Sequence, residues 1–186
     1  LIGRHSFIRQ SKLSDVAGRI DYISNPKRQE YLYATYQTEG ATPEFWKNLA
    51  RESQLDFKAS GSAGKCIEGR EFIIAFPESF VQYRADDVVR LFTETFHKRY
   101  GVECSAALHH NKAKTNYHIH LVFSERKMLE QPEVKIATRN MFYDEQGKHR
   151  RTKKEVLDEQ GNLRAGCSII PKGEVYESHI FTKKDE

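Results

Sequence analysis

Apolar residues recur along the chain with two periods, and each period predicts a different kind of element. Spacings of three and four, as at Val16, Ile20 and Ile23, predict helices over 14–25, 42–54 and 86–100. Alternation or short apolar runs predict strands over 3–9, 71–76, 102–109 and 117–124, with 31–37 either strand or loop. Strands and helices mixed in this way predict an α+β fold.

Local signals fix several of these boundaries. Thr42 can cap the second helix and Pro43 suits its first turn, whereas Pro26 should end the first helix. Gly101 is a natural end for the third helix. Ser14 and Asp15 are expected to open the first helix.

The chain changes character after Arg126. The later part is strongly charged and repeats the sequence Asp-Glu-Gln-Gly at 144–147 and 158–161. Each glycine can adopt a positive φ, so each repeat predicts a hairpin turn. We therefore expect a core over 1–128 and a charged C-terminal extension of the same domain, with short hairpin arms, over 129–186.

Composition narrows the class of protein. A chain of 186 residues with 38% hydrophobic residues can bury one core, and no apolar run approaches the roughly 18 residues of a membrane span. The net charge of +4 permits a nucleic-acid partner. Three cysteines without a CxxC motif predict reduced thiols in a cytosolic protein. The start, Leu-Ile-Gly, lacks a signal core and an initiator Met, which predicts a piece of a longer protein.

A pair of histidines on one strand is the first candidate for chemistry. Alternation places His118, His120 and Val122 on one face of the 117–124 strand, and the strong core set of Ile119, Leu121 and Phe123 on the other. The two side chains are then about 7 Å apart along the strand, so their imidazoles can converge on one ion. The alternative is an ordinary half-exposed polar face.

The neighbouring strand offers a third ligand, with two candidates. A regular strand places His109 on the face of His118 and His120, whereas a bulge near the turn would present His110 instead. Three imidazoles leave coordination positions open for water or a substrate oxygen, as in catalytic rather than structural sites.

Four segments of the chain resemble a known family. The runs 107–111 and 116–126, which hold all four of these histidines, look like the histidine motif of plasmid mobilisation relaxases of the MobA/MobL and MOBP type. The strand 70–77 is similar to the family's strand before its long helix, and 21–26 resembles the segment with the nucleophilic tyrosine. The likeness spans roughly Arg4 to Arg126.

The resemblance implies a HUH endonuclease fold: a central antiparallel sheet with helices on one face and the metal site on the other. It implies nicking of single-stranded or hairpin DNA at an origin of transfer, with a 5′-phosphotyrosine intermediate and Mn²⁺ or Mg²⁺ as cofactor. The nucleophile would be Tyr22, with Tyr33 and Tyr36 in reserve. Relaxosome accessory proteins and a type IV coupling protein would be partners in the bacterial cytoplasm, without a membrane segment.

Other charged residues could support this chemistry. Glu71 opens a strand and could orient a ligand histidine or act as a base, or else form an ordinary ion pair with Arg70. Phosphate contacts are expected from a distributed set of basic side chains, since backbone binding needs positive charge: Arg4, Lys112, Lys114, Arg126, Arg150, Arg151, Lys153 and Lys154.

Two other functions compete with the relaxase. One is a replication-initiator nuclease of the same fold, and the other is a non-catalytic module that binds origin DNA. A denaturant-resistant adduct with an oligonucleotide distinguishes the enzymes from the module.

Overall fold

The computed structural model describes residues 2–10 and 15–183. The chain forms two compact units, one made of Leu1–Met128 with Phe181–Glu186 and the other of Leu129–Ile180. Within the described ranges, no helix is both long enough and apolar enough to cross a membrane.

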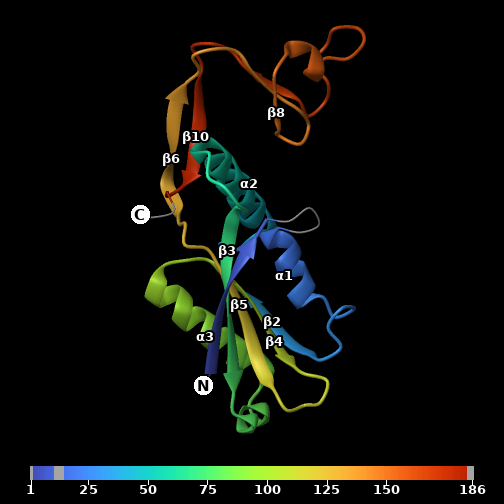
Figure 1. Cartoon of the computed structure of the whole chain (residues 1–186), viewed down its shortest axis with the longest axis vertical. Helices are drawn as coiled ribbons and strands as arrows, with labels where there is room; N and C mark the ends of the chain where they lie inside the picture. The colour runs from blue at the N-terminus through green and yellow to red at the C-terminus, as the bar shows by residue number, and fades with distance from the viewer. Residues whose placement is uncertain (1, 11–14, 184–186) are drawn as a thin grey trace. The chain divides into compact units, whose positions relative to one another are not determined.

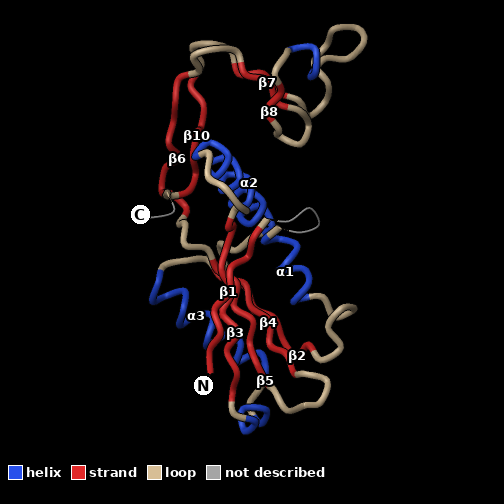
Figure 2. The backbone as a smooth tube through the Cα atoms, in the orientation of Figure 1, coloured by secondary structure: helices blue, strands red, loops and turns tan. Residues whose placement is uncertain are grey.

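A five-stranded antiparallel sheet forms the centre of the first unit (Figures 1 and 2). Its order is β1-β3-β5-β4-β2, so the strand with the histidine pair, β5, is central. The bounds are β1 Ile2–Arg9, β2 Leu32–Gln37, β3 Ile67–Phe76, β4 Cys104–His110 and β5 Tyr117–Phe123. The predicted α+β class and central antiparallel sheet are confirmed.

Three α-helices and a short 3-10 helix surround this sheet: α1 Val16–Ser24, α2 Pro43–Ser60, η1 Glu78–Gln82 and α3 Ala85–Tyr100. The Asp15 carboxylate accepts from Gly18 N and caps α1, while Ser14 lies outside the described residues. Thr42 caps α2 as predicted. That helix extends past residue 54 because nothing before the left-handed Gly61 breaks it.

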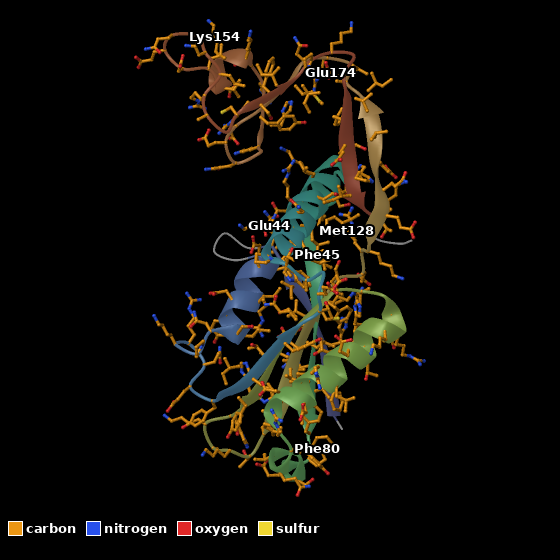
Figure 3. The ribbon with its side chains drawn as sticks, turned by 180° about the vertical axis from the view of Figure 1, so that it is seen from behind. Glu44, Phe45, Phe80, Met128, Lys154 and Glu174 are labelled. Carbon is orange, nitrogen blue, oxygen red and sulfur yellow. The ribbon has the colours of Figure 1, made fainter. Side chains whose placement is uncertain are left out.

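One face of the sheet is apolar and packs against α3. Ile119 and Leu121 of β5 are buried together with Val88 and Val89 of α3. Phe96 of α3 completes the contact, at 4.7 Å between its ring centroid and that of Phe123. Figure 3, seen from behind, shows α3 lying across the sheet.

The opposite face bears the histidines, and it too carries a helix. The side chain of Arg19 in α1 binds Glu71 of β3, and the carbonyl of Ile23 accepts from His109 of β4. The expectation that helices occupy one face only, opposite the metal site, is therefore wrong. The histidine face also has fully buried positions, Ala107 and Val122, and α1 has its own apolar stripe to bury.

The second unit consists of short strands and hairpin turns (Figure 2). β6 Met128–Ile136 pairs with β10 Val175–Phe181, and β7 Met141–Tyr143 pairs with β8 His149–Arg150 and β9 Ser168–Ile170. A 3-10 turn, η2 Lys153–Val156, follows β8.

The repeated Asp-Glu-Gln-Gly sequence forms the same turn twice. Gly147 and Gly161 have φ of 71° and 84°, and each donates its backbone N–H to the carbonyl of the aspartate three residues earlier. The side chains of Asp144 and Asp158 each accept two backbone N–H groups within their own turn. The turn prediction is confirmed.

Candidate metal centre

Three histidines from two paired strands meet on one face of the sheet. His109 of β4 lies directly opposite His118 of β5, and His120 is two residues further along β5. One ring nitrogen from each residue lies within 4.8 Å of the others. Cross-strand pairing and alternation alone create this arrangement.

The spacing of two of these nitrogens suits a shared ion. Nε2 of His118 and Nε2 of His120 are 3.1 Å apart. Two imidazoles bound to one ion at about 2.1 Å, with an angle near 90–109°, hold their nitrogens roughly 3.0–3.4 Å apart. The residues present therefore fit a divalent first-row metal.

A hydrogen-bond acceptor orients each histidine from the other side of its ring. Nδ1 of His118 donates to the carbonyl of Asn116 at 2.9 Å, and Nε2 of His109 donates to the carbonyl of Ile23 at 2.7 Å. A carbonyl only accepts, so these contacts fix the tautomers. The lone pairs left for a metal are Nε2 of His118 and Nδ1 of His109.

The carboxylate of Glu71 orients the ring of His120 in the same way. Its Oε1 accepts from Nδ1 of His120 at 2.6 Å, which leaves Nε2 of that ring for a metal. The alternative partner considered for this carboxylate, Arg70, instead pairs with Glu125.

Burial keeps two of the ligands, His109 and His118, in their neutral form. Desolvation, reinforced by the neighbouring His120, lowers the pKa of His109 to about 4, and desolvation also lowers the pKa of His118. For Glu71, burial alone would raise the pKa. Hydrogen bonds from His120 and Arg19 outweigh burial, so the pKa of Glu71 lies below its ordinary value. At neutral pH His109 and His118 are thus neutral and Glu71 is a charged acceptor.

Arg19 is the residue at this site that the sequence analysis missed. Its Nε and one terminal nitrogen bind the two carboxylate oxygens of Glu71, at 3.1 and 2.7 Å. The available signal was its position one helical turn before Tyr22, on the helix that the family motif singles out.

Tyr22 lies on α1 immediately before Ile23, whose carbonyl orients His109. The residue is 46% exposed, so a large substrate can approach it. Its ring centroid lies 5.5 Å from the guanidinium carbon of Arg19.

The alternative candidates for the third ligand and the nucleophile have their contacts on the other face of the sheet. His110 binds Glu78 of η1 through Nε2 at 2.9 Å and does not join the other three histidines. Tyr36 donates to Glu94 of α3 at 2.6 Å. Tyr33 packs against Tyr117, at 5.6 Å between ring centroids, and against His110.

Three of the basic residues predicted to contact phosphates lie on the histidine face or in the turn between β4 and β5. Arg4 lies on that face, because it pairs with Ile73 of β3, which in turn pairs with His120. Lys112 and Lys114 are exposed in the turn between β4 and β5. All three remain candidates for DNA backbone contact.

Arg126 does not fit the role predicted for it. The residue is 6% exposed, and one terminal nitrogen binds Glu52 at 2.6 Å and Asp56 at 3.0 Å. Its Nε donates to the carbonyl of Thr182. The expectation of a phosphate contact is corrected: this guanidinium forms buried ion pairs and hydrogen bonds within the first unit.

The remaining basic candidates belong to the second unit. Arg150 binds the buried Asp144 through two nitrogens, at 2.9 and 2.8 Å, which commits much of its guanidinium to the fold. Arg151, Lys153 and Lys154 are exposed around η2; Figure 3 labels Lys154. These three are the better candidates for contact with phosphates.

Comparison with known proteins gives one informative match. A sequence model described as the MobA/MobL family matches residues 60–170, more than half of the chain. A search of curated proteins found no match. A solved structure described as "Molecular Basis of Vancomycin Resistance Transfer in Staphylococcus aureus" is 14% identical, with a TM-score of 0.48 over 69% of this chain and 72% of that chain. The family match includes Glu71 and the three histidines, whereas Tyr22 precedes it.

Proposed function

The chain belongs to the MobA/MobL family of plasmid mobilisation relaxases, and from this premise we propose that it is a metal-dependent DNA strand transferase that nicks one strand at an origin of transfer. The observation that carries the proposal is the contact between α1 and the histidines. Tyr22 stands next to the residue whose carbonyl orients His109. The central position of the histidine strand agrees with the HUH endonuclease fold that the resemblance implies.

His109, His118 and His120 would hold the metal, which we propose to be Mn²⁺ or Mg²⁺. A bound divalent ion supplies positive charge where the non-bridging oxygens of the scissile phosphate become more negative. Imidazole nitrogens also accept zinc, nickel, cobalt and iron, so the ligands alone do not select among these ions.

Tyr22 is the proposed nucleophile. Its hydroxyl oxygen forms a bond to the scissile phosphorus, the bond from phosphorus to the 3′ oxygen breaks, and the 3′ oxygen leaves as a hydroxyl. The proton that the tyrosine hydroxyl gives up to water is balanced by the proton that the leaving 3′ oxygen takes from water. The 5′-phosphotyrosine retains the energy of the broken ester, so the strand can be rejoined by the reverse attack.

Glu71 serves as an orienting residue in this proposal rather than as the base. It is 4% exposed, and its oxygens already accept from His120 and Arg19. A carboxylate held in this way fixes the ring of His120 and leaves no oxygen uncommitted for the tyrosine proton.

Substrate binding would use the exposed basic residues. Arg4, Lys112 and Lys114 are proposed to contact the phosphates of single-stranded or hairpin origin DNA. We further propose that the protein works in the bacterial cytoplasm with relaxosome accessory proteins and a type IV coupling protein, as the family assignment implies.

The test is covalent capture of DNA. The protein is incubated with Mn²⁺ and a 5′- or 3′-labelled oligonucleotide spanning the origin of transfer of its own genetic element, then run on a denaturing gel. We expect a shifted band that resists denaturant and carries the 3′ label, because the tyrosine holds the 5′ phosphate of the fragment on the 3′ side of the break. Cleavage without an adduct would indicate hydrolysis by water, and binding without cleavage would indicate a non-catalytic DNA-binding module.

A further inference from the structure

One turn of α1 contacts the metal site at two points and also carries the proposed nucleophile. Arg19 binds Glu71, and four residues later the carbonyl of Ile23 accepts from His109. Tyr22 lies three residues after Arg19, on the same side of the helix. The helix therefore reaches two of the three candidate ligands.

The guanidinium of Arg19 has two neighbours of different kinds. Its edge makes a two-point contact with the Glu71 carboxylate, and the ring of Tyr22 lies 5.5 Å from its central carbon. A planar guanidinium can bind a carboxylate with its edge and an aromatic ring with its face at the same time. A lysine ammonium cannot reproduce both contacts.

Burial makes the contact with Glu71 stiff. The side chain of Glu71 is 5% exposed and that of Arg19 28% exposed, so water competes weakly for this pair. Oε1 of Glu71 accepts from both Arg19 and His120. The position of the guanidinium is thereby transmitted through one oxygen atom to the ring of a candidate metal ligand.

From these contacts we infer that Arg19 is a positioning residue that links the nucleophile to the metal site, by holding Glu71 against His120 and the ring of Tyr22 on its own face. The inference rests on the proposed function for the identity of the nucleophile. It adds that metal binding to the three histidines changes the environment of the Tyr22 ring through Arg19. Arg19 acts through Glu71 and Tyr22 and contacts neither the metal nor the reacting atoms.

The experiment compares Arg19→Gln and Arg19→Lys with Arg28→Gln in the whole chain. Arg28 is the matched control, because it is an arginine just after α1 whose ion pair, with Asp21 at 3.6 Å, is exposed. Mn²⁺ affinity is measured by calorimetry without DNA. Protein labelled with 3-fluorotyrosine is then titrated with Zn²⁺, a diamagnetic ion, and the fluorine resonance of Tyr22 is assigned by its loss in Tyr22→Phe.

We expect Arg19→Gln to weaken Mn²⁺ binding about tenfold, the lower end of the effect of removing support from a metal ligand. In the wild type and Arg28→Gln, the Tyr22 resonance should move when Zn²⁺ binds. In Arg19→Gln at saturating Zn²⁺ it should move by less than half as much, because only the link through Ile23 and His109 remains. Arg19→Lys should restore part of the affinity but not the response of the resonance, and this variant carries the test if Arg19→Gln fails to fold.

Three results would overturn the inference: wild-type Mn²⁺ affinity in Arg19→Gln, an unchanged response of the Tyr22 resonance in that variant, or no response in the wild type. None of these measurements uses DNA. A missing covalent adduct in the gel assay would therefore count against the proposed function alone, and the linkage between Arg19, the metal site and Tyr22 would be judged separately.

Discussion

Nε2 of His109 donates a hydrogen bond to the carbonyl oxygen of Ile23 across 2.7 Å, and this bond joins the central sheet to α1. Both residues are buried. The bond leaves Nδ1 of His109 as the nitrogen for a metal, and it fixes the backbone next to Tyr22. One contact thus contributes to the ligand set and to the placement of the proposed nucleophile.

The first prediction concerns the third metal ligand. His109→Gln should weaken Mn²⁺ binding by at least tenfold, because it removes one of three nitrogens, as measured by calorimetry on the DNA-free protein. His110→Gln is the matched control: the residue is adjacent, equally buried and bound to Glu78 on the other face. Its affinity should stay within about twofold of wild type. The reverse pattern would assign the ligand to His110.

The second prediction concerns the choice of tyrosine. Tyr22→Phe should abolish the covalent adduct while leaving Mn²⁺ affinity unchanged, since phenylalanine keeps the ring beside Arg19 and removes only the nucleophilic oxygen. Tyr33→Phe and Tyr36→Phe should form the adduct normally, because those rings contact groups on the opposite face. An adduct that persists in Tyr22→Phe would assign the nucleophile to another tyrosine.

The third prediction is a pH dependence of stability in the metal-free protein. Burial holds the pKa of His109 near 4, below the value of about 6.5 in an unfolded chain. The unfolded state therefore binds the proton first as the pH falls, and stability is lost on acidification. Between pH 7 and pH 5 this residue alone should cost about 2 kcal/mol of unfolding free energy.

Urea unfolding in the presence of a chelator measures this loss. His118 has a pKa shifted in the same direction and should add to it. The His109→Gln variant should show a clearly smaller loss over the same range. Equal slopes in the two proteins would show that His109 does not titrate as its burial requires.

The fourth prediction tests the internal role of Arg126. Arg126→Ala should lower the unfolding free energy by about 3 kcal/mol or more, because it withdraws the positive charge from the largely buried carboxylate of Glu52. Arg151→Ala, on an exposed arginine of the second unit, should change it by less than about 0.5 kcal/mol. An Arg126→Ala protein as stable as wild type, with weakened DNA binding, would restore the original expectation for Arg126.

The sequence predicted the features that depend on local periodicity. Alternation along 117–124 placed His118 and His120 opposite the apolar face, and the register of β4 with β5 then brings His109, not His110, beside them. The glycines at 147 and 161 likewise marked turns that the structure contains. Such features need only the chain's own neighbours along one or two strands.

Features that depend on packing between distant segments were beyond the sequence. A basic residue such as Arg126 has the same appearance in a sequence whether it faces solvent or buried carboxylates, since only burial separates the two. Arg19 was missed for the same reason: its partner Glu71 is 52 residues away. The helix α1 was predicted, but the face of the sheet that it covers was not.

A pair of hydrogen bonds between Lys127 and Thr182 has a consequence for how this chain can change over evolution. The N–H of Thr182 donates to the carbonyl of Lys127, and the N–H of Lys127 donates to the Thr182 hydroxyl, so the polypeptide leaves the first unit and re-enters it at the same place. Residues 129–180 are therefore an insertion between two adjoining segments of the first unit. We expect this insertion to tolerate changes in length while the histidine site of the first unit stays intact.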